Sequence, residues 1–144
     1  YVQYAHARIA SLRRVAASRG IACPLPSQAD LSCLQDPDEL ALIRKLSTYP
    51  MVLEASATGL EPHRIAYYLR ELAGMVHPFY NKHRILPSTN EGDAGDVTGD
   101  AGEERKQESP DPGLTGARLA LMWSVQQVIR NGLGILGVGA PEQM

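Results

Sequence analysis

The sequence contains 144 residues, 44% of them hydrophobic, which is the size and composition of a single domain with one packed core. Its net charge of −2 hides an asymmetry, because residues 88–113 carry eight acidic and two basic side chains, whereas the remainder carries twelve basic and eight acidic ones. No apolar run reaches the roughly 18 residues of a membrane span, and two cysteines at positions 23 and 33 match no zinc motif, so we expect neither a membrane partner nor a metal site.

Residues 1–19 predict a helix. Apolar side chains recur there at steps of three and four residues, at Val2, Ala5, Ile9, Leu12 and Ala16. Gly20 is a typical residue just after a helix, and the two prolines in residues 21–35 indicate a loop with a short turn. The chain begins in helical register without an initiator methionine or a capping residue, so we expect it to be part of a longer protein.

Residues 36–59 predict a second helical segment in two pieces. Asp36 and Glu39 have the spacing of a capping box, which marks the start of a helix. The predicted buried stripe consists of Leu40, Ile43 and Leu46. Pro50 should break or kink this segment, which then continues to Gly59.

Residues 61–86 predict the third helix. Its apolar stripe contains Ile65, Tyr68 or Leu69, Leu72, Val76, Phe79 and His83. Pro78 lies inside this stripe, and its ring would meet the carbonyl of Gly74, so we expect a tolerated kink rather than a break.

Residues 88–113 are rich in acidic residues, glycine, serine and proline, and they predict a disordered, mobile acidic insertion because they hold too little apolar surface to offset chain entropy. Residues 114–136 predict the last helix. The glycines at positions 132, 134, 137 and 139, at its end and just beyond, leave two interpretations open, a close approach to a partner or a helix that frays into a tail. No segment shows the alternation of a strand. The sequence therefore predicts an all-α domain over residues 1–144, a helical bundle of about four long helices with a long disordered acidic loop before the last one.

Motifs for catalysis are missing from the sequence. It contains no glycine-rich phosphate loop, no histidine–glutamate metal spacing and no nucleophile elbow. The histidines at positions 6, 63, 77 and 83 are scattered and are interpreted as structural. We therefore expect no catalytic residue in this chain.

Aromatic and basic side chains suggest a surface that binds RNA. Tyr4 and Arg8 lie one helical turn apart, and Tyr80 stands in a polar and basic neighbourhood, which suits the stacking of unpaired bases. Candidate phosphate contacts are Arg13, Lys82 and Arg84. The alternative is that Tyr4 and Tyr80 are aromatic residues at the edge of the core, and composition alone favours this second interpretation.

Several ordered blocks of the sequence resemble the C-terminal anticodon-binding domain of arginyl-tRNA synthetases, the DALR type. The opening YVQYAHAR, the block EPHR at 61–64, the block FYN at 79–81 and the ending from Asn131 to Met144 carry the resemblance, together with residues 42–46 and 117–121. Any one block is a weak signal, whereas their common order along nearly the whole chain is specific.

The resemblance implies an all-α domain that docks on the anticodon stem-loop of arginine tRNA, with Tyr4, Arg8, Tyr80 and Met144 around the anticodon bases and His6 orienting the first helix. It implies a cytoplasmic arginine-tRNA ligase whose catalytic domain lies outside this chain. ATP and Mg²⁺ would act in that domain, and this chain would hold no cofactor and bind no DNA. The acidic insertion departs from the family pattern, and repulsion from phosphate should direct it away from the RNA.

A second hypothesis makes the chain a non-catalytic helical protein-interaction module. It predicts an exposed apolar patch and binding that is insensitive to RNA. Leu25 and Leu31 in the early loop are its candidate docking residues.

Overall fold

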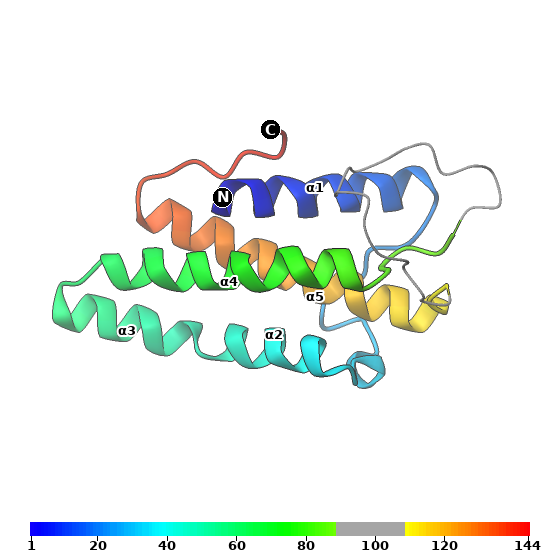
Figure 1. The fold of residues 1–144 in the computed structure, drawn as a ribbon, viewed down its shortest axis with the longest axis horizontal. Helices are drawn as coiled ribbons and strands as arrows, with labels where there is room; N and C mark the ends of the chain where they lie inside the picture. Colours follow the sequence, from blue (N-terminus) through cyan, green and yellow to red (C-terminus); the bar gives the residue numbers. More distant parts are fainter. Residues whose placement is uncertain (89–108) are drawn as a thin grey trace.

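The computed structural model describes residues 1–88 and 109–144, which form helices and connecting turns without a strand among them. The elements in chain order are α1 (Val2–Ser18), the 3-10 turn η1 (Leu31–Cys33), α2 (Pro37–Ser47), α3 (Tyr49–Gly59), α4 (His63–Lys82) and α5 (Pro112–Ile135). In Figure 1 α4 lies along the middle of the molecule, with α1 on one side and α2 and α3 end to end on the other. The predicted all-α bundle is confirmed. None of the described helices is long and apolar enough to span a membrane.

A single hydrophobic core lies between α1, α4 and α5. The apolar stripes predicted for the first and third helices are buried in it, except that Val2 is partly buried. From α5 the core contains Leu119, Met122, Val125, Ile129 and Leu133. The stripe predicted for α2 is only partly right. Leu46 packs against the core, but Ile43 is 37% exposed and Leu42 is the buried apolar residue. The buried face is centred on Leu42 and Glu39, and Glu39 forms an ion pair with Arg118 of α5 at 2.6 Å.

The two pieces of the second segment are separate helices that meet at Thr48. Pro50 lies in the first turn of α3, where its missing N–H disrupts no helical hydrogen bond, so the predicted break falls just before the proline. Gly59 is the last residue of α3, and the following Leu60 adopts the left-handed conformation with φ 55°.

The third helix continues through Pro78, as predicted, but it ends at Lys82 and not near residue 86. His83 is extended, with φ −106° and ψ 127°, and its buried side chain contacts the start of α2. A contact with another helix therefore ends α4 where the apolar pattern alone would continue it.

The predicted acidic insertion lies mostly outside the described residues, which omit 89–108. Its last residues are helical, because α5 begins at Pro112, two residues before the predicted start. The side chain of Asp111 caps this helix by accepting a hydrogen bond from the N–H of Leu114 at 2.8 Å.

The end of α5 is an ordered turn. Gly137 adopts φ +72°, and the N–H of Val138 donates to the carbonyl of Leu133 at 2.9 Å, the pattern of a Schellman cap. The chain then reverses, and residues 138–144, which we call the C-terminal strap, run back beside α1 (Figure 1). The interpretation that this end frays is therefore wrong.

Candidate functional site

Three residues singled out in the sequence, Arg8, Tyr80 and Asn81, meet where α1 runs alongside α4 (Figure 1). The guanidinium carbon of Arg8 lies 4.1 Å from the centre of the Tyr80 ring, and Arg8 Nη2 donates to Asn81 Oδ1 at 3.0 Å. Arg8 is only 6% exposed, so its side chain supports the Tyr80 ring from within the protein instead of extending into solvent. Its Nε is buried without a hydrogen-bond partner among the described residues, which makes this cation–π contact the more important for holding the guanidinium.

Tyr4 forms the exposed part of the site. Its side chain is 42% exposed, and its ring stacks on His77 of α4 with 5.5 Å between ring centres and 25° between planes. Tyr1 also contacts His77, at 4.8 Å and a tilt of 51°. One face of Tyr4 therefore rests on a second ring, which holds it in a defined orientation.

His77 was classed as structural in the sequence, and its place under Tyr4 was missed. Burial, followed by the nearby charge of Arg8, lowers the pKa of His77 below its ordinary value of 6.5. The imidazole is therefore neutral at neutral pH. Its Nε2 is buried without a partner in the described part of the chain, which is consistent with an unprotonated nitrogen. A signal was available, since His77 lies one turn before Tyr80 and Asn81 on the same helix.

Met144 is 75% exposed at the end of the C-terminal strap. The strap is attached to α1 at several points: Gln3 Nε2 donates to the Gly139 carbonyl at 2.8 Å, and Arg14 Nη1 donates to the Glu142 carbonyl at 3.1 Å. His6 is the buried attachment, with Nδ1 2.9 Å from the Pro141 carbonyl. The first helix thus carries Tyr4 and Arg8 on one flank and the strap on another.

The three candidate phosphate contacts all have protein partners. Arg13 donates from Nη1 to Gln126 Oε1 at 3.1 Å, which directs it towards α5. Lys82 pairs with Asp38 at 2.6 Å, and Arg84 donates to the hydroxyl of Ser88. Arg13 is half-buried within the bundle, whereas the Lys82 side chain is 64% exposed and keeps access to solvent.

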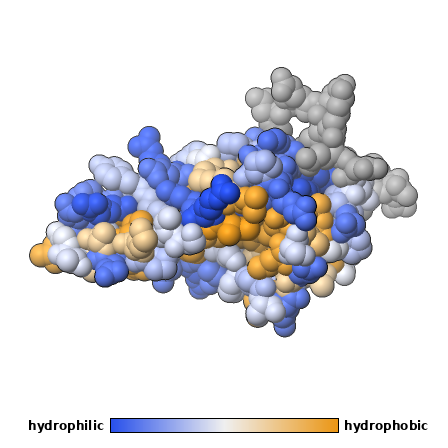
Figure 2. Space-filling view, turned by 90° about the horizontal axis from the view of Figure 1, so that it is seen from below, coloured by the Kyte–Doolittle hydropathy of each residue, from blue (hydrophilic) through white to orange (hydrophobic). Residues whose placement is uncertain are grey.

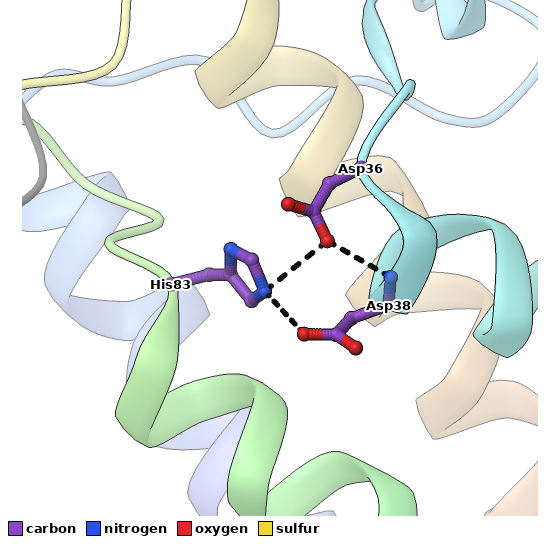
Figure 3. Close-up of side chains that lie close together, drawn as sticks. All are labelled: Asp36, Asp38 and His83. Carbon is purple, nitrogen blue, oxygen red and sulfur yellow. Dashed lines mark hydrogen bonds and ion pairs between the residues drawn. The ribbon is translucent and has the colours of Figure 1, made fainter.

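A polar cluster joins the end of α4 to the start of α2 (Figure 3). His83 Nε2 lies 2.9 Å from Asp38 Oδ2 and 3.5 Å from Asp36 Oδ1, while Asp36 also accepts the N–H of Asp38 at 2.8 Å. The spacing resembles a metal site, but a metal would need Nε2 unprotonated and the proton on Nδ1, which is buried and has no acceptor among the described residues. When His83 Nε2–H donates to the carboxylates and Lys82 pairs with Asp38, the polar groups of the cluster have partners without a metal ion.

This cluster was not predicted, because Asp38 and His83 are 45 positions apart, at opposite ends of the α2–α4 region, and form no sequence motif. The Lys82 hydrogen bond, and then that of His83, lowers the pKa of Asp38 below its ordinary value of 3.8. Next to it, Arg118 Nη1 donates to the carbonyl of Arg84 at 2.7 Å. These contacts fix the segment that follows α4 and thereby the position of the Tyr80 turn.

Apolar side chains are exposed away from the Tyr4 site. Leu25 and Leu31, the docking candidates of the second hypothesis, are 43% and 42% exposed. Figure 2 shows further apolar surface at the end where α3 meets α4 and over the half of the molecule that holds α2. Leu60, directly after α3, is exposed at the first of these places, and Met51 is exposed in the first turn of α3.

The family model of the DALR anticodon binding domain matches residues 2–96 and 103–144 of this chain. The arginine–tRNA ligase of Geobacter metallireducens is 44% identical over 144 residues, and that of Frankia alni is 46% identical over 145 residues. Both alignments cover 100% of this chain but only 22% and 23% of the relatives. The chain thus spans less than a quarter of the length of these relatives.

The fold is similar to part of a solved structure, the arginyl-tRNA synthetase of Thermus thermophilus. The TM-score is 0.70 with 33% identity, and the match covers 100% of this chain and 21% of that one.

Proposed function

Because this chain belongs to the DALR anticodon binding domain family, we propose that it recognises the anticodon stem-loop of arginine tRNA. It would thereby position that tRNA for ATP-dependent aminoacylation by a catalytic domain outside these 144 residues. ATP and Mg²⁺ act in that domain, and the assembled ligase works in the cytoplasm. The partners are therefore an RNA hairpin and the remainder of the synthetase.

The observation that supports this proposal is the exposed Tyr4 ring, which is backed by His77 at 5.5 Å. An unpaired base gains stacking energy on an aromatic ring that is already fixed, because no side-chain freedom is lost on binding. The neutral imidazole beneath Tyr4 adds no charge to this platform. Tyr4 would thus receive one anticodon base on its outer face.

Arg8 has a different role in this mechanism from the one that the resemblance implies. Its guanidinium is buried against Tyr80 and Asn81, so it sets the orientation of the tyrosine from behind. Tyr80 and Tyr4 then provide two aromatic groups on neighbouring helices. Met144 contributes its thioether and backbone, since its terminal carboxylate would be repelled by phosphate.

The test is binding of this chain to the anticodon hairpin of an arginine tRNA and to the same hairpin with its middle anticodon base changed, at two salt concentrations. We expect tighter binding to the first hairpin at both concentrations and weaker binding to each at higher salt. Tyr4→Ala should weaken binding by about 1–3 kcal/mol, the cost of losing one stacked base.

Tyr67→Ala is the matched control, because Tyr67 is an exposed tyrosine of α4 with its ring against His63. It should bind RNA like the unmodified chain. Equal binding to both hairpins, or equal losses in the two tyrosine variants, would contradict the proposal and favour the protein-interaction hypothesis.

A further inference from the structure

The C-terminal strap has one attachment that differs from the others. Gln3 and Arg14 bind strap carbonyls at the protein surface, whereas the His6 side chain is only 2% exposed. Since the Pro141 carbonyl can only accept, His6 Nδ1 must carry the proton that joins them at 2.9 Å. This hydrogen bond is expensive to leave unmade, because the buried imidazole of His6 cannot turn to water.

The position of this bond along the chain limits where Met144 can be. Pro141 is three residues from the terminus, and three residues span at most about 11 Å. His6 lies between Tyr4 and Arg8 along α1 but on the other side of the helix, so a docked Pro141 confines Met144 to within that distance of this stretch of α1. If the strap were released at Gly137, the seven residues that follow would let Met144 move over about 25 Å.

We propose that His6 is a positioning residue for RNA binding, which acts through the strap by confining Met144 near the N-terminal half of α1. This inference rests on the proposed function. His6 touches no RNA in this arrangement, because its side chain is buried between α1 and the strap. Its contribution is to confine the terminal residue before the RNA arrives, so that binding does not have to order seven residues.

Two substitutions separate the hydrogen bond from the volume of the ring. His6→Phe keeps a buried ring but removes the donor. His6→Asn keeps an N–H donor at the same number of bonds from the backbone as Nδ1. The first readout is the rate at which a carboxypeptidase releases Met144, and the second is affinity for the arginine anticodon hairpin. Thermal unfolding shows that each variant is folded.

We expect His6→Phe to release Met144 several times faster and to bind the hairpin about five to ten times more weakly, the size of one buried hydrogen bond. His6→Asn should stay closer to the unmodified chain in both readouts. Gln3→Ala, which removes a surface attachment of the same strap, is the control and should change either readout less than His6→Phe does.

A chain that lacks residues 142–144 decides whether His6 acts through the strap. In that background His6→Phe should change RNA affinity less than about twofold, because the two changes remove the same effect. An equal loss with and without residues 142–144, or unchanged release of Met144 by His6→Phe, would overturn the inference. If the unmodified chain does not distinguish the hairpins, the proposed function fails and the RNA role of His6 with it, whereas the release rate still reports on the strap itself.

Discussion

The guanidinium of Arg8 in α1 lies over the ring of Tyr80 in α4, with 4.1 Å between the guanidinium carbon and the ring centre. The two residues are 72 positions apart, and Asn81 accepts a hydrogen bond from the same guanidinium. An arginine expected at the RNA surface is therefore a buried support. The consequence is that a change at Arg8 alters the site by moving an aromatic ring.

Replacing Arg8 by lysine should weaken hairpin binding although the positive charge is retained. Lysine cannot stack its ammonium as a plane on Tyr80 and also donate to Asn81 in the same geometry. We expect a loss of about 1–2 kcal/mol in RNA binding. Fluorescence anisotropy measures it, and Arg44→Lys on the exposed side of α2 is the control. Identical affinities of the two variants would show that only the charge of Arg8 matters.

Gly132 and Gly134 should respond oppositely to alanine. A Cβ at Gly132 would lie 2.8 Å from both methyl carbons of Leu69, which is 1% exposed and cannot move aside in the core. Gly132→Ala should destabilise the chain by about 1–3 kcal/mol. Gly134, in the same helix, has nothing within 4 Å of such a Cβ, so Gly134→Ala should stabilise by up to about 1 kcal/mol.

Urea unfolding of both glycine variants measures the difference. A loss of stability in both would mean that helix α5 needs glycine for a reason other than its contact with α4. A gain in both would mean that Leu69 repacks.

Removing only one partner of the buried pair of Glu39 and Arg118 should destabilise the fold strongly. Their side chains are 1% and 7% exposed, and the Nε–Oε1 distance is 2.6 Å. Arg118→Met should cost about 3–5 kcal/mol, because it leaves the Glu39 carboxylate charged and buried. Combining it with Glu39→Leu should restore part of this loss. A double variant that is less stable than either single one would contradict this account.

Asp38 should make the stability of the fold depend on pH in the acidic range. Hydrogen bonds from Lys82 and then His83 lower its pKa in the folded protein below the ordinary 3.8. A carboxyl group whose pKa is lowered by folding stabilises the fold fully when the pH is above its pKa in the unfolded chain. This contribution is lost as the pH falls through its lower pKa in the folded chain. The Tm difference between the unmodified chain and Asp38→Asn should therefore be constant from pH 7 to about 5 and shrink at lower pH. Glu54→Gln, a change on the exposed side of α3, is the control.

The helices themselves were largely predictable. Periodic apolar residues in α1 and α4, the capping box of Asp36 and Glu39, and the proline starts of α2 and α3 all act within a few neighbouring residues. The predictions that failed concern residues whose state depends on another helix. Ile43 lies at the edge of a buried face that is centred on Leu42 and on Glu39, the partner of Arg118, and α4 stops at Lys82 because His83 binds Asp38.

The residues of the candidate site fall into the same two groups, those predictable from local sequence and those that depend on another helix. Tyr4 and Tyr80 were chosen as candidates from their neighbours in the sequence, but the burial of Arg8 and the stacking of Tyr4 on His77 depend on how α1 packs along α4. Arg13 belongs to this second group as well, since Gln126 of α5 directs it into the bundle.

The sequence by itself determined that this chain is an all-α domain and which family's ordered blocks it carries, because helix periodicity, caps and short motifs are local properties. Only the tertiary structure decided that Arg8 supports a ring, that His77 backs Tyr4 and that the strap returns to His6. Each of these is a contact between residues more than 70 positions apart in the chain. Such contacts are fixed by the packing angle and register of whole helices, to which every buried side chain contributes and which no short segment of sequence encodes.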